Sequence, residues 1–336
     1  MDINQRIKAF LKLSETLRSF NLKALNAVFE KATATNPWYT PEHIDLAMAG
    51  LAQYLEEEKL YQWIDNYRFN KQNPKTIGVV MAGNIPLAGM HDFISVLISG
   101  HNISAKLSSK DDVLLPFLAQ QLTQIEPRFQ NRILFCDRLK NYDAMIATGS
   151  DNSSRYFEYY FSGVPHIIRK NRTSLAVLSG EENEHAMKGL TRDIFEYFGL
   201  GCRNVSKIMV PATFDLQVLL PYFETFNHFI DHNKYANNYH YQKAIMLMNA
   251  TPHIDAGFSI LMENTQLVSP VSVLYYERYR EQEAARACIS RNRQKLQCIV
   301  AGQGFLDDAI PFGKAQKPEL WDYADNVDTL KFLAQL

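Results

Sequence analysis

A cysteine at position 202 stands where thiol chemistry could take place. It lies in the stretch FGLGCRNVSKIMVP, residues 198–211, between a glycine-containing turn and alternating apolar and polar residues. A thiolate attacks carbonyl carbon atoms, but a free thiol with a pKa of about 8.5 is only a few per cent ionised at neutral pH. Cys202 is therefore either a nucleophile whose thiolate is favoured by Arg203 or a helix terminus, or a small residue that fills the core.

Small and polar residues gather after two strand-like runs. In VVMAGNIPLAG, residues 79–89, Asn84 offers a side-chain amide donor, and the small residues let the backbone approach a ligand. In IATGSDNSS, residues 146–154, Gly149 and Ser150 can present backbone N–H groups to a phosphate at the start of a helix. Ligands of doubly wound sheets bind beyond the carboxyl ends of strands. We therefore expect these two segments and Cys202 each to follow the carboxyl end of a strand.

The composition limits the class of protein. The chain has 336 residues, of which 46% are hydrophobic and 21% charged, and this predicts a globular protein of two lobes. A net charge of -1 gives no general attraction for nucleic acid or an anionic membrane. The four cysteines form no CxxC pair, the start MDINQR is unlike a secretory leader, and no apolar run reaches about 18 residues. We therefore expect a cytoplasmic protein without an integral membrane segment.

The elements that must position these residues follow from the hydrophobic pattern. Residues 1–70 read as helices, and TPEHIDLAMAGLAQYL opens with Thr40 as an N-cap and Pro41 in the first turn. This part shows no evident chemistry. From residue 75 onward, short runs predict strands that alternate with helices, which is typical of a parallel sheet covered on both faces. These runs are TIGVVM, ISAKLS, RILFC, AMIATG, SLAVLS, KIMVP, PVSVLYYE and CIVAG.

In this order, the segments resemble the aldehyde dehydrogenase superfamily and, within it, the LuxC-type acyl-CoA reductases. The resemblance rests on AGNIPL, SAKLSS, ATGS, GCRNVSKIMVP, SPVSVL and the closing PFG. It implies an α/β fold with a Rossmann-type parallel sheet. The N-terminal helices and the cofactor domain would occupy residues 1–200 and 303–336, and a smaller α/β catalytic domain would occupy residues 201–302.

The resemblance assigns a role to each candidate residue. Cys202 would form an acyl-enzyme, and Asn84 would donate a hydrogen bond to the oxyanion together with the backbone N–H of Cys202. Without the resemblance, Asn84 is a turn residue before Pro86 and Lys106 is a solvated lysine at a strand end. The cofactor contacts would come from Lys106, Ser109, Gly149, Ser150 and Gln266.

The implied cofactor is NADPH, with NADH as an alternative. Hydrolysing relatives carry a carboxylate two or three positions after the lysine, where it binds ribose hydroxyls. This sequence has Ser108 and Ser109 there, followed by Lys110. A missing anion and an added cation favour the 2′-phosphate of NADPH.

One departure from the dehydrogenase pattern separates two chemistries. The glutamate that activates water in aldehyde-oxidising relatives aligns with Arg169 of RKNRTSLAVL. An arginine cannot serve as a general base. The resemblance therefore implies reduction of an acyl thioester, carried by coenzyme A or an acyl carrier protein, to an aldehyde. The alternatives are an acyl-phosphate reductase and a non-catalytic nucleotide-binding scaffold, and a homo-oligomer is left open.

Other reactive or aromatic residues have simpler interpretations. His228 and His232 lie four residues apart, with His240 further on, but a third metal ligand at suitable spacing is missing. The runs YFEYYF and PYFETFNHF suggest a site for a fatty tail, although helical spacing favours core packing. We expect Cys136, Cys288 and Cys298 to be structural.

Overall fold

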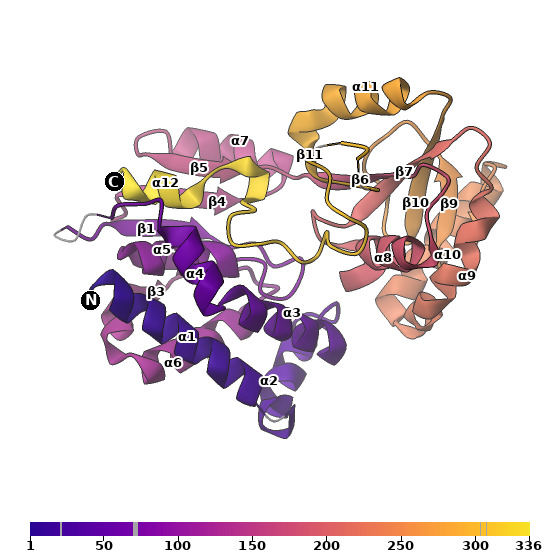
Figure 1. The fold of residues 1–336 in the computed structure, drawn as a ribbon. Coiled ribbons are helices and arrows are strands. Elements are labelled where there is room, and N and C mark those ends of the chain that lie inside the picture. The colour runs from indigo at the N-terminus through magenta and orange to yellow at the C-terminus, as the bar shows by residue number, and fades with distance from the viewer. Residues whose placement is uncertain (21, 70–72, 303, 307) are drawn as a thin grey trace. The chain divides into compact units, whose positions relative to one another are not determined.

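The computed structural model describes residues 1–20, 22–69, 73–302, 304–306 and 308–336, which form two compact units (Figure 1). Unit 1 comprises Met1–Asn171 and Glu319–Leu336, and unit 2 comprises Arg172–Pro318. The sequence placed the divisions near residues 200 and 303. The difference arises because strand β6 (Thr173–Val177), which precedes Cys202, pairs with strands of unit 2. A strand pattern alone does not reveal which sheet the strand joins.

Unit 1 is built on a five-stranded parallel sheet with the order β3-β2-β1-β4-β5 (Figure 1). Its strands are β1 (Thr76–Val80), β2 (Asn102–Lys106), β3 (Ile133–Phe135), β4 (Ala144–Thr148) and β5 (His166–Arg169). Strand order reverses between β1 and β4, and this switch point is where such sheets bind ligands. The loops after β1 and β4 carry Asn84 and the Gly149–Ser150 pair.

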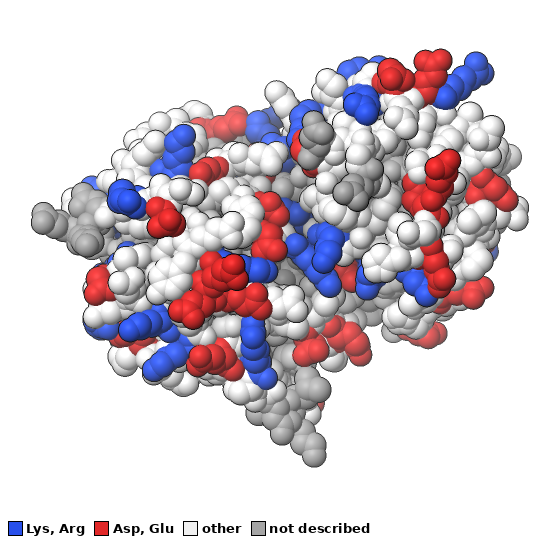
Figure 2. Space-filling view, viewed as in Figure 1, with Lys and Arg blue, Asp and Glu red and all other residues white. Residues whose placement is uncertain are grey.

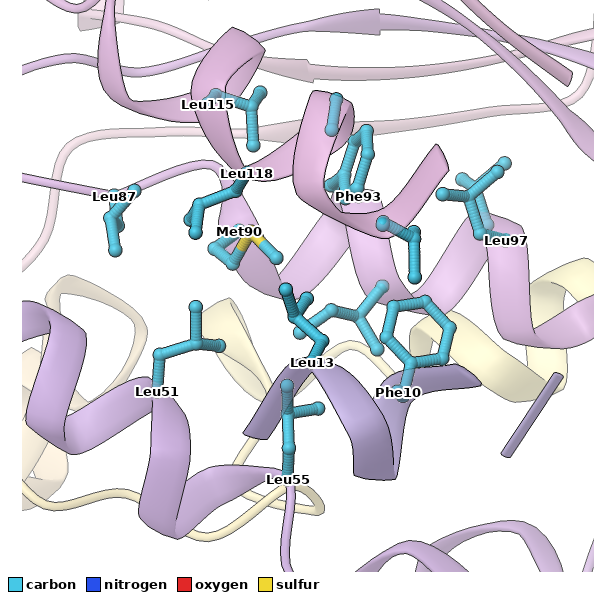
Figure 3. Packing of buried hydrophobic residues seen from close by; sticks show 14 of the residues in the cluster. Phe10, Leu13, Leu51, Leu55, Leu87, Met90, Phe93, Leu97, Leu115 and Leu118 are labelled. Carbon is cyan, nitrogen blue, oxygen red and sulfur yellow. The ribbon is translucent and has the colours of Figure 1, made fainter. Parts of the chain in front are cut away.

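The helices of unit 1 cover this sheet and add an N-terminal layer. They are α1 (Ile3–Ser19), α2 (Leu22–Thr35), α3 (Pro41–Tyr54), α4 (Glu57–Ile64), α5 (Met90–Ser99), α6 (Leu114–Ile125), α7 (Asp151–Tyr160) and α12 (Thr329–Ala334). Thr40 caps α3 by accepting from the His43 N–H, with Pro41 in the first turn, as predicted. Figure 3 shows Phe10 and Leu13 of α1 packed toward Met90 and Phe93 of α5. The N-terminal helices therefore share one core with the sheet-covering helices.

Unit 2 contains a six-stranded sheet with the order β11-β6-β7-β10-β9-β8. Besides β6, its strands are β7 (Val205–Pro211), β8 (Ile254–Asp255), β9 (Ile260–Glu263), β10 (Val273–Tyr279) and β11 (Leu296–Ala301). The pairs are parallel except for β8 with β9. The helices are α8 (Glu184–Phe195), α9 (Leu220–Phe223), α10 (Asn233–Met248) and α11 (Gln282–Asn292).

Short 3-10 helices connect several of these elements. They are η1 (Pro127–Arg132), η2 (Glu196–Gly199), η3 (Leu216–Leu219), η4 (Glu224–Asp231), η5 (Arg293–Lys295) and η6 (Ala324–Asn326). The α/β fold class and each strand-like run quoted from the sequence are confirmed. The quoted runs did not include β5, β8 or β9, which are short.

The surface and the cysteines add two observations. Acidic and basic side chains are interspersed on the visible face (Figure 2), in keeping with a net charge of -1. All four cysteines are free thiols. Within the described ranges, no helix combines the length and the apolar character needed to cross a bilayer.

Candidate active site

Unit 1 gathers five predicted site residues at the carboxyl edge of its sheet. Lys106 ends β2, and its register partner is Val80, the last residue of β1. Ser109 lies in the turn just after β2, Asn84 lies in the loop after β1, and Gly149 follows β4. The side chains of Asn84, Lys106 and Ser109 are exposed. These residues come from separate parts of the sequence, and the parallel register brings their strand ends together.

The start of α7 provides donors for an anion. Ser150 is the N-cap, and its hydroxyl accepts from the Ser153 N–H at 3.3 Å. A Cβ at Gly149 would lie 2.8 Å from the Phe157 ring and 2.9 Å from Ser153 Cβ, so glycine is needed for this close packing. Lys106 ends β2, Lys110 follows four residues later, and both are exposed. Helix N–H groups, hydroxyls and cations form a donor set that suits a phosphate-containing cofactor.

The Asn84 loop packs tightly on the turn that carries Ser109. A Cβ at Gly83 would lie 2.6 Å from Cβ and Oγ of Ser108, which leaves no room for a side chain. The Met81 N–H donates to the Lys106 carbonyl at 3.0 Å, which continues the pairing of β1 with β2. The two loops therefore form one continuous surface.

Cys202 lies in a different kind of position from the one predicted. We expected it at the carboxyl end of a strand, but it follows η2 and precedes β7. The prediction was wrong because the segment between α8 and β7 turns through residues with positive φ instead of forming a strand, and its glycines and aromatic residues do not distinguish such a turn from a strand end. The Cys202 residue is exposed, unlike Cys288 and Cys298, which are buried.

Asn204 anchors the loop of Cys202 to the end of α8. Its Oδ1 accepts from the Gly201 N–H at 2.8 Å. Its Nδ2 donates to the carbonyl groups of Asp193 at 3.2 Å, Ile194 at 3.3 Å and Glu196 at 2.8 Å. These carbonyls are left unpaired where a helix ends, so one buried amide both caps α8 and closes the loop around Cys202.

The turn before Cys202 uses an unfavourable backbone conformation. Tyr197, Phe198 and Gly199 have φ of 55°, 58° and 73°, and only glycine adopts such values without steric cost. Phe198 is buried, with its ring 4.4 Å from that of Phe229 and 4.6 Å from that of His232. The run PYFETFNHF thus supplies core packing that holds this turn. By contrast, Tyr156, Tyr159 and Tyr160 of YFEYYF are exposed, so core packing was the wrong expectation for that run.

Side chains of β6 and β11 contact the loop that carries Cys202. Ser174 of β6 donates to the Cys202 carbonyl at 3.0 Å and accepts from the Cys298 N–H at 3.1 Å. Arg203 donates from Nη1 to Cys298 Sγ at 3.2 Å and to the Ala315 carbonyl at 3.3 Å. The guanidinium that we considered as an activator of Cys202 therefore has Cys298 as a sulfur partner. Ser174 and Cys298 lie far from Cys202 in the sequence, and no motif identified them.

The segment that carries Gln266 is tied to the first residues of β7. Ser206 donates to the Leu267 carbonyl at 2.6 Å, and Lys207 Nζ donates to the Thr265 carbonyl at 3.0 Å. Lys207 is fully buried and also pairs with Glu277 of β10. Unit 2 therefore brings the Gln266 segment to the strand that begins three residues after Cys202.

Asp193 fixes the turn formed by the PFG motif. Its carboxylate accepts from the Gly313 N–H at 2.6 Å and from the Ala315 N–H at 3.0 Å. A Cβ at Gly189, one helical turn before Asp193, would lie 2.7 Å from the Phe312 carbonyl carbon, so α8 packs directly on this turn. Burial raises the pKa of Asp193 to about 7, outweighing the two N–H donors that lower it.

This raised pKa predicts a pH-dependent stability. Between about pH 4 and pH 7 the folded chain keeps a proton on Asp193 that the unfolded chain loses, so stability falls as the pH rises. From about pH 4.5 to about pH 7.5, we expect the wild type to lose roughly 3 kcal/mol of unfolding free energy relative to Asp193→Asn. Urea unfolding of both proteins across this range measures the difference. A constant difference would contradict the assignment.

Arg169 lies in unit 1 and has a structural partner. Its guanidinium is 5% exposed and forms a buried ion pair with Asp92 of α5. It also donates to the Thr329 hydroxyl at 2.8 Å, which joins α12 to the end of β5. The structure thus explains an arginine at this position by the packing of three elements.

The histidines flank the aromatic cluster of unit 2. His232 caps α10 by accepting from the Tyr235 N–H at 3.3 Å, and His228 packs against the Phe229 ring. In the part of the chain that the structure describes, no group of three His, Cys, Asp or Glu side chains is placed to hold a metal ion.

The fold is similar to that of aldehyde dehydrogenases. The indole-3-acetaldehyde dehydrogenase AldA of P. syringae, solved with NAD+ and IAA, is 11% identical, with a TM-score of 0.67 over 92% of this chain and 74% of that one. The NADP-dependent glyceraldehyde-3-phosphate dehydrogenase of Bacillus halodurans, solved with NADP, is 11% identical, with a TM-score of 0.64 and coverages of 94% and 77%. A propionaldehyde dehydrogenase of Clostridium phytofermentans is also 11% identical, with a TM-score of 0.63 and coverages of 94% and 82%.

The sequence comparisons agree with this fold. No curated protein matches the chain. The family model of LuxC acyl-CoA reductases matches residues 3–213, which is more than half of the 336 residues. The chain therefore belongs to the LuxC family of acyl-CoA reductases.

Proposed function

We propose that this protein reduces an acyl thioester to an aldehyde, using NADPH, through an acyl group bound to Cys202. The observation that carries the proposal is the position of Cys202. It is exposed on a loop whose backbone is held by Asn204 and Ser174. A nucleophile must be accessible and still held in one geometry, and this arrangement supports both requirements.

The proposed reaction begins at the Cys202 sulfur. The thiolate attacks the acyl carbon, and the carbonyl electrons move to oxygen, where the Asn84 amide and the Cys202 N–H donate hydrogen bonds. Collapse of this species breaks the bond to the carrier, which leaves as a thiolate and takes up a proton. The bound cofactor supplies the hydride that reduces the acyl group. The Cys202–carbon bond then breaks, which releases the aldehyde and restores the thiolate.

We propose a role in cofactor binding for each of five residues. Ser150 and the N–H groups of α7 would hold the pyrophosphate, with Gly149 allowing close approach. Lys106 and Ser109 would face the adenine ribose and its 2′-phosphate, and Gln266 would hold the nicotinamide ribose. Two structural relatives were solved with NAD+ or NADP, which supports a nicotinamide cofactor. The absence of a carboxylate at residues 108–110 supports NADPH.

The acyl acceptor is proposed to be hydride rather than water. Hydrolysis of an acyl-enzyme needs a general base, and the residue aligned with that base is Arg169. Its guanidinium cannot accept a proton at any useful pH, and it is paired with Asp92. The argument supports an enzyme that takes its acyl group from a thioester.

The proposal is tested by following NADPH oxidation with acyl-CoA of short, medium and long chain, acyl carrier protein and acyl phosphate. We expect oxidation with at least one thioester, release of the free carrier and aldehyde in equal amounts, and slower turnover with NADH. Turnover with acyl phosphate alone would replace the thioester by a phosphate substrate. Cofactor binding without turnover of any acyl donor would support the scaffold alternative and overturn the proposal.

A further inference from the structure

The loop that carries Asn84 has a strained backbone just beyond that residue. Leu87 has a φ of 60°, in the left-handed region that a branched side chain rarely adopts. Its side chain is buried in the core of unit 1, in the cluster that Figure 3 draws with Met90 and Leu118. Such a conformation persists only where surrounding contacts determine it, and the loop therefore depends on its anchors.

Tyr39 provides one of these anchors. It lies between α2 and α3, in the N-terminal part where the sequence showed no chemistry, and it is 1% exposed. Its hydroxyl donates to the carbonyl of Ile85, the residue after Asn84, at 2.9 Å. Its own backbone is fixed, because its N–H donates to the Asn36 carbonyl at 2.8 Å and its carbonyl accepts from Thr33 at 2.6 Å.

Asp111 provides the second anchor. Its Oδ2 accepts from the Leu87 N–H at 3.2 Å, and its own N–H donates to the Ser108 carbonyl at 3.0 Å. The carboxyl group is buried beside the Tyr39 hydroxyl, and burial raises the pKa of Asp111 to about 6. Burial, followed by this neighbouring carboxyl group, raises the pKa of Tyr39. The tyrosine therefore stays protonated and able to donate.

We propose that Tyr39 and Asp111 are positioning residues that hold the Asn84 amide in its oxyanion-binding orientation. This inference rests on the proposed function. Asn84 is exposed, whereas Tyr39 holds the carbonyl of Ile85 and Asp111 holds the N–H of Leu87. The N-terminal helices would then contribute to acyl transfer through the backbone of this loop.

The test uses a double-mutant cycle on acyl transfer. Tyr39→Phe removes the hydroxyl and keeps the ring, and Asn84→Ala removes the proposed donor. The rate of carrier release from acyl-CoA is measured in single turnover, together with KM and the rate of Cys202 alkylation by iodoacetamide. We expect Tyr39→Phe to slow acyl transfer about tenfold, to leave KM and alkylation within about twofold, and to have no further effect in the Asn84→Ala protein.

A partly buried tyrosine of the same unit gives a control. The Tyr67 hydroxyl donates to Asp328 at 2.9 Å and has no hydrogen bond to the Asn84 loop among those the structure gives for the described residues. We expect Tyr67→Phe to lower thermal stability without changing the acyl-transfer rate. Asp111→Asn, which keeps an acceptor for Leu87, should lose less activity than Asp111→Ala.

Two outcomes would overturn the inference. An unchanged acyl-transfer rate in Tyr39→Phe would do so, as would an equal loss in the wild-type and Asn84→Ala backgrounds, since Tyr39 would then act elsewhere. Failure of the proposed function is recognised separately, because the wild type itself would release no carrier. In that case the positioning role of Tyr39 and Asp111 is also rejected.

Discussion

Cys202→Ala is expected to lower thioester-dependent NADPH oxidation to the background rate, a loss on the order of 10⁵-fold, as found when a covalent nucleophile is removed. The alanine leaves no atom that can form the acyl-enzyme, whereas the contacts of Ser174 and Asn204 to the loop backbone remain available. Transfer of the acyl group to Cys202 is measured separately, in the absence of cofactor. Intact-protein mass after mixing with acyl-CoA should rise by one acyl group in the wild type and stay unchanged in the variant.

Another cysteine provides the control for this result. Cys136 is partly exposed, and its sulfur lies 3.4 Å from the Ser104 hydroxyl in unit 1. Cys136→Ala should keep both the mass increase and the turnover. Acylation of Cys202→Ala at another residue, with aldehyde still formed, would assign the nucleophile elsewhere.

The sequence predicted those parts of the fold that local patterns determine. Runs such as TIGVVM and AMIATG lie in strands buried on both faces, so their apolar residues are consecutive. Thr40 and Pro41 marked the start of α3 because capping needs only neighbouring residues. The motif order added the fold family, which local patterns alone could not provide.

The sequence could not reveal the residues that support the site. Ser174 and Cys298 contact the Cys202 loop from other strands, and their types carry no signal of that contact. Tyr39 was hidden for the same reason, because a buried tyrosine in a helical region is ordinarily core. The sequence also could not predict which aromatic side chains are exposed. Tyr159 and Phe229 lie in similar aromatic runs, but only Tyr159 is exposed.

Arg169 shows how packing can account for a residue that the motif comparison treated as a chemical signal. The pair with Asp92 is buried on both sides, with side-chain exposures of 5% and 7%. Asp92→Ala is therefore expected to reduce the unfolding free energy by about 3–5 kcal/mol, because it leaves a buried guanidinium without its counterion. The Thr329 hydroxyl remains a partner but carries no charge. Urea unfolding at pH 7 gives the value.

Two controls accompany the Asp92→Ala measurement: a variant of an exposed ion pair, and a variant in which both Asp92 and Arg169 are replaced. Glu184→Ala breaks the solvent-exposed pair with Lys188 and should change the stability little by comparison. Replacing both partners, as Asp92→Leu with Arg169→Met, should restore most of the loss, since no unpaired charge remains. If this double variant also reduces acyl thioesters at an unchanged rate, Arg169 serves packing alone. A stable double variant that hydrolyses its acyl-enzyme would instead show that the arginine helps to exclude water.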